Sequence, residues 1–390
     1  MRMNCRHCFV AVTFLLVGIS PHIIEAQTPI LIENEEFKGD AQTAIDSLYN
    51  RNPDSAREIL NPWMEQFPDH PLWTLWNGME LWWSVLNDLH NEQYDDEFFH
   101  VMRRADYEAS QLLRNHRDHP DALIIRAIAN GYTARHHSNR EEWLTAANIG
   151  RRAYQAYSRL MEVLPSLPDN DFAEGMKRYY AAYIPENYPA VRAVSWFLPD
   201  GNREEGLELL QVASEEGVFA RPEATYFLGN ILLNYEGDYE KALLYFRQLV
   251  DQYPSNSYFR RLYVRTLHEL KRYEELIVFS TESIEYMNDD SLPENMILLE
   301  EIYYWKGISQ YQTGDMQNAI ESFTQSYRIG QQLPNPDKRP IQALSAYHAG
   351  RTSERLNDVS QAEHFYEIVL NHDNSEEAKK RAKKRLEALQ

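Results

Sequence analysis

Side chains that could bind a metal ion gather at two places in the first half of the sequence. His116, Asp118 and His119 lie close together, and His136 and His137 are adjacent. A structural zinc site needs roughly four converging ligands, and a catalytic one roughly three. Histidine is also common in the last turn of a helix, where polar side chains face solvent. We therefore interpret both groups as polar helix ends and expect no metal site.

The other residue types that carry catalytic chemistry form no recognisable motif. Cys5 and Cys8 have the spacing of a redox or zinc pair, but they precede an apolar run instead of opening a folded helix. Glu204 and Glu205 are adjacent acids at an expected helix start, where carboxylates favour the first backbone amides. The chain contains no glycine-rich phosphate loop, nucleophile elbow or His-Glu-x-x-His helix. The sequence thus predicts a protein without catalytic residues, metal or cofactor.

The N-terminus has the features of a secretory signal peptide over residues 1–26. Arg2 and Arg6 give a basic start, residues 8–19 form a short apolar run, and Ala26 ends a plausible cleavage site. The run is shorter than the roughly 20 residues of a membrane-spanning helix, and no later stretch reaches that length. We expect an exported protein, periplasmic or associated with the outer membrane, without a transmembrane segment after cleavage.

The charge balance narrows the choice of partner. The chain has 39 lysines and arginines against 59 acidic residues, a formal net charge of −20. A surface of this kind repels nucleic acid and anionic lipid through its average electrostatic field. The composition therefore favours a basic or neutral protein ligand and disfavours nucleic acid.

Helices must position these side chains, because the apolar residues follow a helical period. Between Asp40 and Pro68 they recur at intervals of three and four, and Asn52 and Pro53 divide the segment into a hairpin. Further along, a glycine precedes an alanine by twelve or thirteen positions, and an aromatic residue follows four later. These positions are Gly229, Ala242 and Phe246, then Gly307, Ala319 and Phe323, then Gly350, Ala362 and Tyr366. Small residues let two antiparallel helices approach closely, and the aromatic side chain fills the groove alongside.

This spacing resembles the tetratricopeptide repeat, a helix-turn-helix unit of about 34 residues. The resemblance is strong from about Glu204 to the C-terminus and weaker between Asp40 and Asp200. It implies an all-α fold, an α-solenoid of about six to seven stacked antiparallel helical hairpins with a C-terminal capping helix. The expected segments are a flexible stretch over 27–39, divergent hairpins over 40–200, repeats over 201–374 (clearest over 223–256, 300–333 and 343–374) and the capping helix over 375–390.

The resemblance further implies a noncatalytic scaffold that binds a protein or peptide on its concave surface, which the first helix of each hairpin lines. The side chains one step past each buried helix face are candidates for this groove. They are Tyr226, Asn230, Tyr304, Tyr311, Tyr347 and Arg351. Tyrosine offers flat apolar area with a hydrogen-bonding tip, which suits an extended peptide. Packing of the same side chains between neighbouring hairpins is the alternative interpretation.

An aromatic segment in the first third supports a hypothesis from another class. Trp73, Trp76, Trp82 and Trp83 lie around Gly78. A stripe of this kind is typical of a helix core. If these side chains were exposed, they would suit a carbohydrate or cell-wall ligand, with or without hydrolytic activity. A structural assembly subunit is a third hypothesis, which large exposed apolar patches would favour.

Overall fold

The computed structural model describes residues 28–187, 201–288, 293–372 and 375–389, and their regular secondary structure is entirely helical. The predicted signal peptide, residues 1–26, lies outside these ranges. None of the described helices combines the length and the apolar character that crossing a bilayer requires. The fold class is therefore all-α, and this prediction from the sequence is confirmed.

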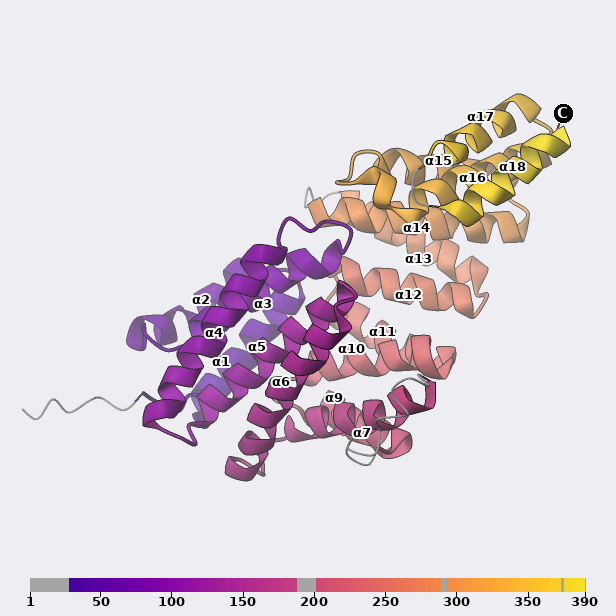
Figure 1. The fold of residues 1–390 in the computed structure, drawn as a ribbon. Coiled ribbons are helices and arrows are strands. Elements are labelled where there is room, and N and C mark those ends of the chain that lie inside the picture. The colour runs from indigo at the N-terminus through magenta and orange to yellow at the C-terminus, as the bar shows by residue number, and fades with distance from the viewer. Residues whose placement is uncertain (1–27, 188–200, 289–292, 373–374, 390) are drawn as a thin grey trace, which may run out of the picture.

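The helices form successive pairs along the chain (Figure 1). The first four pairs are α1 (Glu35–Tyr49) with α2 (Pro53–Gln66), α3 (Leu72–Asn87) with α4 (Asp95–Asn115), α5 (Pro120–Asn139) with α6 (Trp143–Val163), and α7 (Asn170–Asn187) with α9 (Arg203–Glu216). The next four are α10 (Arg221–Ile231) with α11 (Tyr239–Gln252), α12 (Ser257–Glu269) with α13 (Tyr273–Asn288), α14 (Pro293–Thr313) with α15 (Met316–Gly330), and α16 (Pro340–Arg355) with α17 (Val359–Leu370). The described ranges thus hold eight pairs instead of six to seven, because the weakly patterned first half supplies four.

Aspartate caps determine where the second helix begins in the clearest repeats. Asp238, Asp315 and Asp358 precede α11, α15 and α17, and each carboxylate accepts a hydrogen bond from the amide of the third residue after it. A cap of this kind stabilises a helix by about 1 kcal/mol. Pro53 and Pro340 stand in the first turn of α2 and α16, where a missing amide hydrogen costs nothing.

The repeated glycine lies against the repeated aromatic ring of the paired helix. A Cβ atom at Gly307 of α14 would lie 2.8 Å from the ring of Phe323 of α15, closer than carbon atoms pack. Ala319 and Phe323 have no exposed surface. The same contact joins Gly229 to Phe246 and Gly350 to Tyr366. The spacing in the sequence therefore corresponds to a close approach of two helix backbones, which any side chain at the glycine would prevent.

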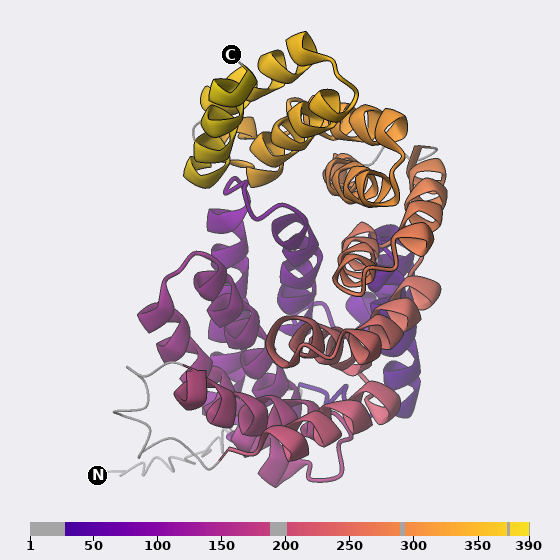
Figure 2. The same cartoon turned by 90° about the vertical axis from the view of Figure 1, so that its right-hand side faces the viewer.

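The stack of pairs curves until its early helices contact its later ones (Figure 2). Tyr49 at the end of α1 packs against Phe259 of α12, with ring centroids 6.3 Å apart. Trp83 of α3 meets the same ring edge-on at 5.8 Å. The buried apolar side chains of α1–α5 consequently share one core with those of α10–α13. Helices far apart in the sequence thus stabilise each other directly, in addition to the contacts between neighbouring pairs.

The segment before α1 is part of this core, whereas the sequence led us to expect a flexible stretch. Leu31 and Ile32 are buried, and their backbone amides donate to the carboxylate of Asp121 at 2.6 and 3.1 Å. The segment lacks helical periodicity, and the carboxylate that binds it lies 90 residues beyond Leu31. A pattern in the sequence therefore could not reveal this anchor.

The last helix, α18 (Glu376–Leu389), has one apolar and one basic face. Ala378 and Ala382 are buried on its inner side. Lys380, Lys383 and Lys384 are exposed on its outer side. A polar outer face of this kind is typical of helices that cap a solenoid.

Candidate functional site

The predicted groove residues lie on α10, α14 and α16, the first helices of three pairs. Tyr226, Tyr304 and Tyr347 are only 5%, 7% and 7% exposed. Asn230, Tyr311 and Arg351 are partly exposed; Asn230 donates to the Tyr226 hydroxyl at 3.0 Å. In this conformation the three buried tyrosines offer little area to a partner, so the accessible part of the candidate groove is smaller than the sequence suggests.

Around Tyr226 the inner face of the solenoid is occupied by the chain itself. Arg135 of α5 donates to the Tyr226 hydroxyl and to the carboxylate of Glu223, each at 2.8 Å. Its guanidinium carbon lies 4.9 Å from the ring centroid of Tyr226 and 5.0 Å from that of Trp82. Tyr49 of α1 donates to the same Glu223 at 2.5 Å. Burial also raises the pKa of the Tyr226 hydroxyl well above its usual value.

Three predicted residues meet at the C-terminal end of the inner face. Arg351 of α16 lies 3.4 Å from the hydroxyl of Tyr347 and 3.5 Å from that of Tyr311 on α14. The guanidinium of Arg355, which sequence reasoning missed, lies 4.7 Å from the centre of the Tyr311 ring. Arg355 is exposed and follows Arg351 by four residues, one helical turn. Tyr304 does not join this cluster and packs instead against Phe323 and His348.

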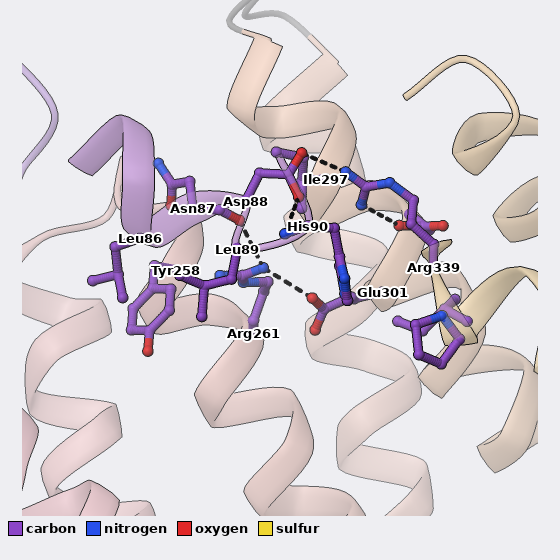
Figure 3. Close-up of a pocket in the computed structure, with 13 residues that line it drawn as sticks. Leu86, Asn87, Asp88, Leu89, His90, Tyr258, Arg261, Ile297, Glu301 and Arg339 are labelled. Carbon is purple, nitrogen blue, oxygen red and sulfur yellow. Dashed lines mark hydrogen bonds and ion pairs between the residues drawn. The ribbon is translucent and has the colours of Figure 1, made fainter. Parts of the chain in front are cut away.

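A buried charge network closes the N-terminal pairs onto the C-terminal ones, and sequence reasoning missed it. Arg339, just before α16, donates to Glu300 of α14 at 3.1 Å and also to Asp88 in the turn after α3 (Figure 3). Gln342 donates to the other oxygen of Glu300 at 2.8 Å. A cavity of about 160 Å³ borders this network and is lined from both halves of the chain. The carboxylates of Asp88 and Glu300 share the single guanidinium of Arg339. The three side chains together therefore carry a net negative charge when both carboxylates are ionised.

The buried position of Glu300 changes the pKa of its carboxyl. Burial raises the pKa of its carboxyl to about 7, although Arg339 favours the charged form. Beside it, Arg261 of α12 donates to Glu301 at 2.9 Å and to the backbone carbonyl of Asn87 at 3.2 Å (Figure 3). Burial also lowers the pKa of His90, which lines the same cavity. The contact between the N-terminal and C-terminal helix pairs therefore contains two groups, Glu300 and His90, whose pKa values differ between the folded and the unfolded chain.

The histidines are not all polar helix ends in solvent, so that interpretation was wrong. His119 is buried, and its Nε2 lies 3.2 Å from the backbone oxygen of Thr28. His136 is also buried, with Nε2 2.9 Å from Asp95. Burial lowers the pKa of both imidazoles. Neither belongs to a group of three or more potential metal ligands within the described ranges. Helices α3 and α4 cover the His136 ring, and the N-terminal segment contacts His119, which local sequence could not show.

The tryptophans of α3 are buried, which confirms their interpretation as core. Trp73, Trp76, Trp82 and Trp83 are 9%, 4%, 3% and 4% exposed. Their rings pack among the other helices, as Trp82 does against Phe98 with centroids 5.4 Å apart. The carbohydrate hypothesis thereby loses the exposed aromatic surface on which it depended.

Comparisons with known proteins identify the repeats. A tetratricopeptide repeat family model matches residues 200–256 and 231–275, and a second matches residues 300–329. No curated protein gives a significant match. The solved structures that are similar include a MamA double mutant (RS-1 ArsTM) and a MamA chain from Desulfovibrio magneticus RS-1 that begins at its residue 41.

Both MamA structures are 19% identical to this chain, with TM-scores of 0.35 and 0.34. Each alignment covers 52% of this chain and 97% of the MamA chain. Because both TM-scores are low, the identification rests on the repeat models and on the helical pairs that coincide with them. The matched residues include α9 to α12 and most of α14 and α15, so the second half of the chain contains tetratricopeptide repeats, as the glycine, alanine and aromatic spacing predicts.

Proposed function

We propose that this protein is an exported, noncatalytic scaffold that binds a protein or peptide partner on the C-terminal end of its concave face. Its tetratricopeptide repeats support a protein-binding role. The observation that carries the choice of surface is the cluster of Tyr311, Tyr347, Arg351 and Arg355. The Tyr311 ring and the Arg351 guanidinium are partly exposed, and Arg355 is exposed. Tyr347 is buried, and its hydroxyl contacts Arg351.

The remainder of the concave face is less accessible, which favours this location. Around α10 and α12 it is covered by α1, α3 and α5, with Arg135 and Tyr49 bonded to Glu223. A partner there would have to displace a packed core. At α14 and α16 an aromatic ring flanked by two guanidinium groups presents apolar area and hydrogen-bond donors together, a combination typical of binding hot spots. An extended segment with aromatic and carbonyl or carboxylate groups fits this chemistry.

Crosslinking in the cells that produce the protein tests the proposal. The tagged wild type is compared with the double variant Tyr311→Ser/Arg351→Gln and with the matched control Tyr107→Ser/Arg328→Gln, which changes exposed side chains on α4 and α15. We expect the wild type and the control to capture the same partner, and the groove variant to lose at least about tenfold of the signal. Equal capture by all three proteins would contradict the choice of surface.

Cell fractionation tests export separately. We expect the mature chain in the periplasmic or outer-membrane fraction, with its N-terminus after residue 26 by mass spectrometry. A cytoplasmic protein that keeps residues 1–26 would contradict export. The choice of binding surface would still be decided by the crosslinking test.

A further inference from the structure

A second surface, away from the concave cluster, has the features of a ligand cleft. It lies where α4, α5 and α6 pack side by side (Figure 1) and has a volume of about 420 Å³. This volume is within the range of about 300–1,000 Å³ typical of small-ligand sites. Its lining residues include Met102, Arg103, Asp106, Thr133, Ile149 and Arg152.

The polar groups at the floor of the cleft are satisfied within the protein. Asp106 accepts hydrogen bonds from Arg126 and from the amide of Asn130, each at 2.8 Å. The hydroxyl of Thr133 donates to the backbone oxygen of Ala129 at 2.7 Å. The negative charge of Asp106 is therefore balanced by Arg126, and the floor contributes little net charge to a ligand.

The walls carry two exposed arginines, Arg103 on α4 and Arg152 on α6. Among the described residues, neither forms an ion pair or a side-chain hydrogen bond. Their sequence neighbours differ, since Arg104 pairs with Glu108 at 2.7 Å and Arg151 bonds to Asn148 at 3.3 Å. Although the chain has a net charge of −20, these two guanidinium groups give the walls of the cleft a local positive charge.

We propose that this cleft binds the carboxylate groups of an acidic peptide segment. A guanidinium group binds a carboxylate through paired hydrogen bonds, and two such groups on one cleft can hold neighbouring acidic side chains. The apolar atoms of Met102 and Ile149 in the lining can pack against the methylene groups of glutamate. The net charge of −20 over the whole chain disfavours a long polyanion such as nucleic acid, which would extend beyond the cleft over the rest of the surface. The choice of a peptide as ligand rests on the proposed scaffold function.

Fluorescence anisotropy with a labelled tetraglutamate peptide tests the inference on the purified protein. The variant Arg103→Gln/Arg152→Gln removes both cleft charges, and Arg104→Gln/Arg151→Gln removes the same charge from the adjacent positions. All four side chains are largely in solvent, so both variants should fold, as circular dichroism can verify. We expect the cleft variant to bind at least about tenfold more weakly than the wild type, and the control to change by less than about threefold.

Three results would overturn the inference. The first is an absence of peptide binding by the wild type. The second is an equal loss of affinity in both variants, which would indicate diffuse electrostatic attraction. The third is displacement of the peptide by equimolar inorganic phosphate, which would indicate a simple anion site. The scaffold proposal is judged separately, by partner capture with the Tyr311→Ser/Arg351→Gln protein. Its outcome does not depend on the tetraglutamate measurement.

Discussion

Glu300 should make the stability of the closed structure depend on pH. Its pKa is raised to about 7 because burial penalises the charged carboxylate by more than Arg339 and Gln342 stabilise it. In the unfolded chain the same carboxyl has its ordinary pKa of 4.5. The folded state therefore holds this proton more tightly. Unfolding releases it between about pH 4.5 and about pH 7, so the free energy of unfolding falls as pH rises through that window.

The size of the effect follows from the difference in pKa. Each pKa unit corresponds to about 1.4 kcal/mol, so a rise from 4.5 to about 7 corresponds to about 3 kcal/mol of stability. This contribution is complete below pH 4.5 and lost above about pH 7. Buried histidines, including His119 and His136, change stability in the opposite direction over part of this range, because burial lowers their pKa. A pH profile of the wild type alone would thus mix several groups.

The substitution Glu300→Gln isolates the carboxyl, because glutamine has nearly the same shape and does not titrate. We expect urea unfolding of variant and wild type to differ little at about pH 4, where the Glu300 carboxyl is mostly neutral in the folded and in the unfolded chain. At about pH 8 the variant should have gained about 3 kcal/mol relative to the wild type. The same difference between the two proteins at both pH values would refute the argument that Glu300 is neutral in the folded state at low pH.

Two further substitutions test the packing of the closed structure by urea unfolding. Arg339→Met leaves two buried carboxylates without their cation and should cost about 3–5 kcal/mol at about pH 8, whereas a cost below about 1 kcal/mol would contradict a tight network. Gly330→Ala should cost about 1–3 kcal/mol, because its Cβ would lie 1.6 Å from the side-chain nitrogen of buried Gln342. Gly39→Ala, in the exposed middle of α1 with no atom near the added Cβ, should instead add about 0.5–1 kcal/mol.

Sequence reasoning succeeded where the determining contact is local. The glycine of a first helix and the aromatic ring of the second helix, such as Gly350 and Tyr366, lie within one repeat, so their spacing is fixed by two helices and one turn. The tryptophans of α3 follow a helical period, and their burial agrees with the core interpretation. Each feature involves residues near in sequence, which periodicity can detect.

The candidate site was harder to predict, because closure of the solenoid joins distant residues. Arg339 and Asp88 are 251 residues apart, and nothing in either local pattern indicates that they meet. The same applies to Tyr226, whose place on α10 predicts a groove position but whose hydroxyl is bonded to Arg135 of α5. Projection along one helix shows which face a side chain occupies, but it does not show which other helix covers that face.

The contact between the early and the late helix pairs also changes which part of the solenoid surface can bind a partner. A solenoid usually presents a continuous concave surface, because each repeat contacts only its neighbours. Here Trp83 and Tyr49 pack on Phe259, and Arg339 bridges Asp88 and Glu300, so the middle of that surface becomes protein interior. A ligand that needed this surface would have to break a core contact and a buried charge network together, at a cost of several kcal/mol. Binding at the exposed ends or flanks avoids that cost, which is why we place one proposed site on α14 and α16 and the other on α4, α5 and α6.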